Sequence, residues 1–236
     1  MFGGNGDDRM FGDAGSDVIK GGVDADTIEG GVGDDDLSGQ AGKDLLFGFD
    51  GKDTLDGGAD NDSLNGGTGA DFLAGGANND RLIGDAGNDT LAGEGDNDVF
   101  SGLEGADVLY GGDGDDFLRG GSDRDTLTGG AGSDVFNFKY YGPDHADRIV
   151  DFLPGTDYIA LTSSSFPAVH ESLDAQEFRL GTAAADGNDR IIYNSATGRL
   201  YYDPDGTLNG ASSAGQVLIA TFANHAALSH LDFYMF

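Results

Sequence analysis

Large apolar residues recur at every ninth position from Met10 to Phe136. From Gly3 to Asn137 the sequence divides into 15 nine-residue units without insertion or deletion, and we number the residues of each unit 1 to 9. Position 8 is large and apolar in all 15 units, most often Leu. Its neighbours at positions 7 and 9 are expected to face outward, so the triplet predicts a minimal β-strand with one inward side chain.

Glycine is the second residue type that recurs in the repeat. Position 1 is Gly in every unit, and positions 1 to 6 are glycine-rich, which predicts a tight turn with positive φ angles. One unit cannot bury its single apolar residue alone, but units stacked two to a coil bury all of them between two sheets. The sequence therefore predicts an all-β fold, a parallel β-roll of 15 nonapeptide units in which two units make one 18-residue coil.

Packing explains glycine and leucine but not the aspartate that occupies position 6 of every unit. These candidate metal ligands are Asp8, Asp17, Asp26, Asp35, Asp44, Asp53, Asp62, Asp71, Asp80, Asp89, Asp98, Asp107, Asp116, Asp125 and Asp134. In a roll, carboxylates of like charge stack about 4.8 Å apart along both edges, which is unfavourable without a counter-ion. A hard divalent cation bound by carboxylate and carbonyl oxygens removes the conflict, and Ca²⁺ suits such a site better than Mg²⁺.

With these features the chain resembles the RTX family of calcium-binding nonapeptide-repeat proteins. The resemblance implies a parallel β-roll whose loops hold Ca²⁺ between neighbouring coils. Eight odd-numbered and seven even-numbered units lie on opposite edges, which allows at most 13 such ions. A metal-free parallel β-helix is the alternative, but that fold has no use for an invariant aspartate.

Some units depart from the repeat. Position 4 is Asp or Asn in five units, residue types that tolerate left-handed backbone geometry. Position 2 lacks glycine in six units, and we expect ion occupancy to be least certain near Phe49 and Leu103. Several departures recur four units later, as at Asp13, Phe49 and Asp85, which indicates growth by duplication of four-unit blocks.

Composition and charge divide the chain and exclude several classes. Of 236 residues, 12 are Lys or Arg and 43 are Asp or Glu, giving a net charge of −31, so nucleic acid is not an expected partner. The chain has no cysteine, which excludes disulfides and thiolate sites, and no apolar run approaches the roughly 18 residues of a transmembrane helix. With 7 bases and 31 acids, residues 1–137 carry −24, whereas residues 138–236 hold all four prolines. We expect a roll over 1–137 and a small mixed β cap over 138–236.

The second region has longer expected elements. Strands are predicted at 148–152 and 158–161 around a Pro154-Gly155 turn, at 216–222 and at 232–236, with a hairpin of 190–193 and 199–202 and a short helix at 173–178. A cap of this kind covers the apolar side chains and strand edges of the last coil.

This region resembles the C-terminal part of serralysin-type secreted metalloproteases. The resemblance rests on the hexapeptide Asp147-Arg148-Ile149-Val150-Asp151-Phe152, the pentapeptide Gly155-Thr156-Asp157-Tyr158-Ile159, and the run RLYYDPDG at 199–206. Asp144 and Asp151 are further candidate calcium ligands. Asp203-Pro204-Asp205-Gly206 is another, although a solvated turn is the preferred interpretation there.

The last residues, Asp232-Phe233-Tyr234-Met235-Phe236, resemble the acidic and apolar terminus that type I secretion exporters recognise. A buried final strand would have the same pattern. Beside an RTX array, and without the features of a secretory signal peptide at the N-terminus, the resemblance implies a secreted, extracellular protein that a Gram-negative type I exporter carries. The target at a cell surface or on another protein stays open.

Catalytic motifs are not evident, and we expect no enzyme here. His170-Glu171 begins a zinc-protease motif, but residue 174 is Asp where the second histidine belongs. The two functional classes are then a self-standing calcium-binding exoprotein and the C-terminal piece of a larger secreted enzyme. Met1-Phe2 match positions 8 and 9 of a preceding unit, which favours the second.

Two uses of the outer surface are also considered. Ice binding would require a regular Thr-x-Thr array, and only Thr126 and Thr128 fit it, so it is rejected. An adhesive surface is open, because several apolar residues are expected to point outward on one sheet. They are Phe11, Leu45, Phe47, Ile83 and Phe117.

Overall fold

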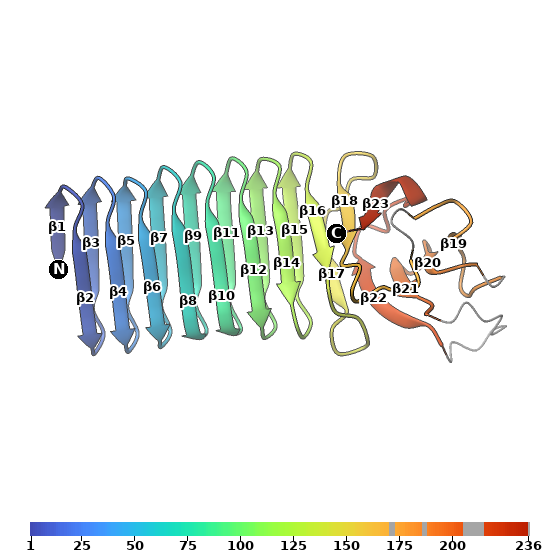
Figure 1. Cartoon of the computed structure of the whole chain (residues 1–236), viewed down its shortest axis with the longest axis horizontal. Helices are drawn as coiled ribbons and strands as arrows, with labels where there is room; N and C mark the ends of the chain where they lie inside the picture. Colours follow the sequence, from blue (N-terminus) through green and yellow to red (C-terminus); the bar gives the residue numbers. More distant parts are fainter. Residues whose placement is uncertain (170–172, 186–187, 205–214, 236) are drawn as a thin grey trace.

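The computed structural model describes residues 1–169, 173–185, 188–204 and 215–235. It confirms an all-β fold in which strands stack alternately into two sheets, with the cap at the end opposite the N-terminus (Figure 1). Parallel neighbours in the roll are one coil apart, so Leu37 lies opposite Leu55, and the aspartates that bond between coils are separated by 18 positions. The predicted 18-residue coil is therefore confirmed.

The strands belong to a 13-stranded and a 10-stranded sheet. In order across the first sheet they are β1 (Phe2–Asn5), β3 (Val18–Val23), β5 (Asp36–Ala41), β7 (Thr54–Ala59), β9 (Phe72–Ala77), β11 (Thr90–Gly95), β13 (Val108–Asp113), β15 (Thr126–Ala131), β17 (Asp147–Ile149), β22 (Val217–Phe222), β21 (Arg199–Tyr202), β20 (Ile191–Asn194) and β19 (Phe178–Leu180). In order across the second they are β2 (Arg9–Ala14), β4 (Thr27–Val32), β6 (Leu45–Asp50), β8 (Ser63–Gly69), β10 (Arg81–Gly87), β12 (Val99–Glu104), β14 (Phe117–Gly121), β16 (Val135–Phe138), β18 (Tyr158–Leu161) and β23 (Phe233–Met235).

The core of the roll is the column of position-8 side chains between the two sheets. Met10 is 5% exposed and the other fourteen are 0–1% exposed. Burying one such side chain contributes about 1.5–3 kcal/mol. Because each coil contributes only two of these residues, a single coil has too little apolar surface to fold alone, and stability accumulates by stacking.

The strands are longer than the triplets expected from the apolar pattern. Most run from position 7 of one unit through position 3 of the next, as Val18–Val23 does, and the turn is then confined to positions 4 to 6. The expectation that all six glycine-rich positions turn is wrong, because the backbones of positions 1 to 3 remain in register with the neighbouring coil. Within the roll, positive φ angles fall at positions 2 and 4, as at Gly22 and Gly33.

Six residues other than glycine take positive φ at position 2. The bulkiest are Phe49 (φ 75°) and Leu103 (φ 82°), both on the outer face of the 10-stranded sheet. A backbone held in this region costs about 1–3 kcal/mol in a residue with a Cβ. Phe49 is 48% exposed and Leu103 39% exposed, so burial of these side chains offsets that cost only in part.

Both sheets continue past Asn137 into the cap. β15 pairs with β17 in parallel, with Leu127 opposite Ile149, and β16 pairs with β18, with Phe136 opposite Ile159. Ile149 and Ile159 therefore occupy the place of position 8 in two further strands whose connecting loops are longer. Whether residues 1–137 and 138–236 fold as separate domains stays a prediction.

Most expected elements of the cap are present. β18 has the predicted bounds, and β20 and β21 form the predicted antiparallel hairpin with Ile191 opposite Tyr202. The strands expected at 148–152, 216–222 and 232–236 are shorter, and a 3-10 turn (His230–Asp232) precedes β23. The rest of the cap core is aromatic, with Phe152 packed edge-on against Phe222 at 5.3 Å between ring centroids.

The short helix expected at 173–178 is wrong. The Asp174 side chain accepts hydrogen bonds from the backbone N–H groups of Gln176 and Glu177, and a turn leads into β19 at Phe178. Such side-chain bonds compete with helical backbone bonds, which explains the difference. Within the described ranges, no helix is long and apolar enough to cross a membrane.

Candidate metal centre

The position-6 aspartates form a ladder along each edge of the roll. One carboxylate oxygen, Oδ1, accepts a hydrogen bond from the backbone N–H of the position-6 aspartate one coil earlier, as Asp62 does from Asp44 at 2.8 Å. Thirteen such bonds of 2.7–3.1 Å join the fifteen aspartates. The bond holds each accepting carboxylate, from Asp26 to Asp134, in one orientation, and thirteen is the number of interfaces between neighbouring units on the two edges.

The second carboxylate oxygen, Oδ2, has no hydrogen-bond partner in the described structure in fourteen of the fifteen aspartates, and it is buried in all fourteen. The exception is Asp8, in the first coil, which is only half-buried. A buried oxygen of an ionised carboxylate without a partner costs several kcal/mol. Hydrogen bonds within the described structure do not offset this cost at any of the fourteen oxygens.

The position-1 glycines leave room beside these oxygens. A Cβ atom at Gly57 would lie 2.5 Å from Oδ2 of Asp62 and 2.6 Å from the backbone oxygen of Gly75 in the next coil. The same two kinds of oxygen flank eleven position-1 glycines, which are Gly3, Gly12, Gly21, Gly30, Gly39, Gly48, Gly57, Gly84, Gly93, Gly102 and Gly111. Their φ angles are not positive, so glycine is needed at position 1 for space and not for backbone conformation.

Burial dominates the electrostatics of the ladder. It raises the pKa of Asp35, Asp44 and Asp89, and the charges of neighbouring aspartates act in the same direction. Burial also raises the pKa to about 6 in Asp53, Asp71, Asp80 and Asp134, to about 7 in Asp62, Asp98 and Asp116, and to about 8 in Asp107. The edges therefore favour either protons or cations on these carboxylates at neutral pH.

The donor set fits a hard cation. Carboxylate and backbone carbonyl oxygens are the ligands that Ca²⁺ prefers, at about 2.3–2.6 Å, and it accepts the irregular geometry that main-chain oxygens provide. Among the described residues, no group of three or more His, Cys, Asp or Glu side chains has metal-binding geometry. A cation at these edges would therefore need backbone carbonyl oxygens as ligands in addition to carboxylates.

Two further aspartates continue the ladder into the cap, and the sequence analysis did not select them. Asp147 Oδ1 accepts the backbone N–H of Asp125 at 3.1 Å, and Asp157 Oδ1 accepts that of Asp134 at 3.2 Å. Burial, followed by the charge of Asp125, holds the pKa of Asp147 well above its ordinary value. The triplets Asp147-Arg148-Ile149 and Asp157-Tyr158-Ile159 repeat positions 6 to 8, and this pattern was the available signal.

The two cap aspartates selected from the sequence lie elsewhere. Asp144 is exposed and 4.0 Å from the Arg124 guanidinium, outside the ladder. Asp151 accepts the backbone N–H groups of Gly129 and Gly130, both at 3.0 Å, where β17 has ended and no longer pairs with β15. Asp151 therefore caps two backbone donors with its two oxygens. The third candidate site was the run from Asp203 to Gly206. Asp203 is buried, whereas Asp205 and Gly206 lie outside the described residues.

A second ladder at position 5 was also missed. In six places an Asp or Asn side chain at position 5 accepts the backbone N–H of position 5 in the next coil, as Asp34 does from Lys52 at 2.9 Å. Ala, Ser, Lys and Arg also occur at this position, so the sequence pattern is weak. These bonds close the turn against the following coil without using the position-6 carboxylates.

The histidines take separate places. Nδ1 of His145 accepts the backbone N–H of Asp123 at 2.8 Å, His225 lies in a turn with φ 52°, and His230 begins the 3-10 turn before β23. His170 and Glu171, the start of the incomplete zinc motif, lie outside the described residues.

Comparison with solved structures finds 36 matching chains. One is the AlgE6R3 subunit of the Azotobacter vinelandii mannuronan C5-epimerase, at 21% identity over 94% of this chain and 78% of that chain, with a TM-score of 0.21. Another is the extracellular lipase LipA from Serratia marcescens, at 16% identity over 93% of this chain, which spans only 40% of the lipase, with a TM-score of 0.21. Scores this low carry no argument about fold or function.

No curated protein matches the chain. The model of the RTX calcium-binding nonapeptide repeat matches four times, at residues 2–37, 29–64, 65–100 and 101–136. These matches together span residues 2–136, more than half of the chain, and they coincide with the aspartate ladders. The chain therefore belongs to the family of RTX calcium-binding nonapeptide-repeat proteins.

Proposed function

We propose that this chain is a secreted calcium-responsive module that folds when Ca²⁺ binds after type I export. The observation that carries the proposal is the set of fourteen buried Oδ2 atoms without hydrogen-bond partners in the described structure. The position-6 aspartates, from Asp8 to Asp134, together with position-1 backbone oxygens, would hold up to 13 ions between neighbouring coils.

The charge of the repeat region supports coupling of folding to calcium. Residues 1–137 carry 31 acidic and 7 basic residues, so without cations mutual repulsion opposes stacking of the coils. Sites of this type exist only when adjacent coils are stacked, and ion binding then supplies free energy of folding. Extracellular calcium modules commonly bind at about 0.1–1 mM, in the range of calcium outside cells.

Export in an unfolded state is consistent with the C-terminal residues. Asp232 Oδ1 accepts the backbone N–H of Gly155, and its other oxygen accepts the backbone N–H of Ser229. β23 then pairs with β18. In the folded cap this segment is engaged, so an exporter that recognises residues 232–236 would have to do so before the cap forms.

A second candidate keeps the same calcium chemistry and differs in what the module serves. In it, the roll and cap are the calcium-binding C-terminal part of a larger secreted enzyme, as the serralysin-like residues 147–152 favour. We assign no catalytic step to the chain itself. Reading the gene upstream of Met1 distinguishes the two candidates, since the second requires a catalytic domain encoded there.

The decisive experiment is circular dichroism of the full chain during titration with CaCl₂, with MgCl₂ as the control. We expect little β-structure in EGTA, a cooperative gain of β-signal with Ca²⁺ and no comparable gain with Mg²⁺. A β-signal that is already complete in EGTA at neutral pH and unchanged by Ca²⁺ would contradict the proposal.

A further inference from the structure

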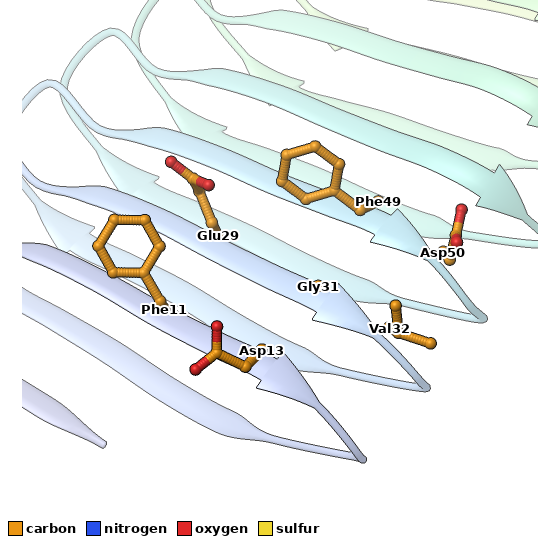
Figure 2. A pocket seen from close by; sticks show the side chains of 7 residues that line it. All are labelled: Phe11, Asp13, Glu29, Gly31, Val32, Phe49 and Asp50. Carbon is orange, nitrogen blue, oxygen red and sulfur yellow. The ribbon is translucent and has the colours of Figure 1, made fainter.

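A groove of about 310 Å³ lies on the outer face of the 10-stranded sheet and reaches the ends of its strands, where Asp13, Val32 and Asp50 precede the turns (Figure 2). It crosses β2, β4 and β6, and its lining includes Phe11, Asp13, Glu29, Gly31, Phe49 and Asp50. Two aromatic rings and three carboxylates therefore surround one hollow. None of these acids occupies position 6, so they are not among the candidate calcium ligands.

Gly31 keeps the hollow open. Its φ of +112° disfavours any residue with a Cβ, and an added Cβ would collide with the backbone oxygen of Asp13. The rings of Phe11 and Phe49 stand on β2 and β6, on opposite sides of β4, with Glu29 between them (Figure 2). The spacing of strands places those two backbones about 10 Å apart, enough for one flat side chain beside each ring.

Phe49 is the one aromatic residue at position 2 of a repeat unit, and its ring contacts only one other ring in the described structure, that of Phe47 at 6.0 Å between centroids. It holds a bulky side chain at φ +75°, where glycine is the unstrained choice, and the side chain is half-exposed. Strain that burial does not offset is a recognised mark of a residue kept for binding. The equivalent position on the 13-stranded sheet contains only Gly, Gln or Glu, so the aromatic side chain is particular to this face.

Within this chain, a guanidinium group already binds at the edge of the groove. The Arg9 guanidinium lies 4.9 Å from the centroid of the Phe11 ring and binds Glu29 at 2.8 Å. Across the hollow, Phe49 supplies a second ring, and Asp50 supplies a carboxylate at the end of β6 (Figure 2). In the described structure Asp50 accepts a hydrogen bond from Thr68 Oγ1 at 3.0 Å and no cation approaches the Phe49 ring.

We propose that this groove binds an arginine side chain of a partner polypeptide, with the guanidinium against the Phe49 ring and its N–H groups directed to Asp13 and Asp50. Guanidinium suits the site because it is flat and weakly hydrated, stacks on aromatic rings and donates several hydrogen bonds to carboxylates. With Arg9 counted, the groove and its rim carry a net charge of −2, which favours a cationic side chain in the groove.

The test is a ¹⁵N NMR titration of the full chain, saturated with Ca²⁺, using a capped tetrapeptide with a single arginine. The matched control peptide has citrulline, which is uncharged and has nearly the same shape. We expect shifts at the amides of Gly31, Val32 and Asp50 that saturate at roughly millimolar peptide, and binding about tenfold weaker for citrulline. Equal binding of both peptides, or no shifts, would overturn the proposal.

Two variants make the test specific to the groove. Phe49→Gly removes the ring and relieves the positive-φ strain, so it should fold at least as well, and we expect binding about fivefold weaker. Gln40→Gly makes the same kind of change at position 2 of the opposite sheet and should leave binding unchanged. Unchanged binding in Phe49→Gly, or shifts produced by a neutral oligosaccharide and not by the arginine peptide, would refute an arginine site.

Discussion

The backbone N–H of Asp44 donates to Oδ1 of Asp62 at 2.8 Å, one coil further on, and the second oxygen of Asp62 is then left buried with no hydrogen-bond partner in the described structure. Oδ1 of this carboxylate thus fixes the register of two coils, whereas Oδ2 lies beside Gly57 and near the backbone oxygen of Gly75. This arrangement repeats along both edges, and the first three of the following predictions rest on it, whereas the fourth concerns the junction of roll and cap.

Replacing ladder aspartates should weaken calcium-induced folding. In Asp62→Asn combined with Asp80→Asn and Asp98→Asn, the amide oxygen still accepts the inter-coil bond, but three negative charges are lost at the edge. Each lost charged interaction costs about 1.5–3 kcal/mol, and because the three losses are shared over a cooperative transition of up to 13 ions, we expect the midpoint Ca²⁺ concentration to rise by about two- to threefold. The control is Asp56→Asn on the outer face of β7, and an equal shift in that control would contradict a ligand role for the ladder.

Filling the space beside Asp62 should have a similar effect by a steric route. An added Cβ at Gly57 would lie 2.5 Å from Asp62 Oδ2 and 2.6 Å from the Gly75 oxygen, whereas a Cβ at Gly95 would meet nothing within 4 Å. We expect Gly57→Ala to cost about 1–3 kcal/mol of stability in Ca²⁺ and to raise the calcium midpoint. Thermal unfolding of Gly95→Ala, which should match the parent protein, is the comparison that shows the effect is local.

Protonation of the ladder aspartates should partly replace calcium in stabilising the folded state. The folded pKa values of the ladder aspartates lie above their unfolded value of about 3.9, reaching about 7 in Asp62 and about 8 in Asp107, so the metal-free folded state binds more protons than the unfolded state. Its stability is therefore greatest below about pH 4 and falls as the pH rises through about 6–8. In EGTA, β-signal should be stronger at pH 4.5 than at pH 8, and addition of Ca²⁺ near pH 7 should release protons.

The pH prediction has a clear opposite result. Loss of β-signal on acidification in EGTA would show that protonation of the carboxylates does not reduce the charge repulsion along the coil edges. Proton uptake on addition of Ca²⁺, measured with a pH indicator in weak buffer, would contradict competition between protons and calcium at the same groups.

Asp151 should behave as a backbone cap. Because both of its oxygens accept N–H groups, from Gly129 and Gly130, Asp151→Ala leaves two donors unpaired at the junction of roll and cap. We expect a loss of about 1–3 kcal/mol in Ca²⁺ without a change in the number of bound ions, whereas Asp144→Ala should change neither. Equilibrium dialysis that finds fewer ions bound to Asp151→Ala would establish it as a ligand instead.

The sequence alone predicts the features that follow from the nine-residue period. Stacking of identical nine-residue units requires position 8 inside and position 6 at the edge, so the roll, its two-unit coil and the aspartate rows could be derived without coordinates. The true strand length could not, because the glycines at positions 1 and 2 are compatible with both a turn and a strand, and only pairing with the next coil selects the strand.

What only the tertiary structure decided lies where the period breaks or where neighbouring coils meet. Loops of different length brought Asp147 and Asp157 into the ladder in place of Asp144 and Asp151, since spacing after Asn137 no longer locates a residue on an edge. The buried Oδ2 atoms that lack hydrogen-bond partners in the described structure, and the groove beside Phe49, both form between strands that are one or two coils apart. Local sequence determines which residues a coil contains, whereas the contacts of one coil with the next determine which atoms are left free to bind.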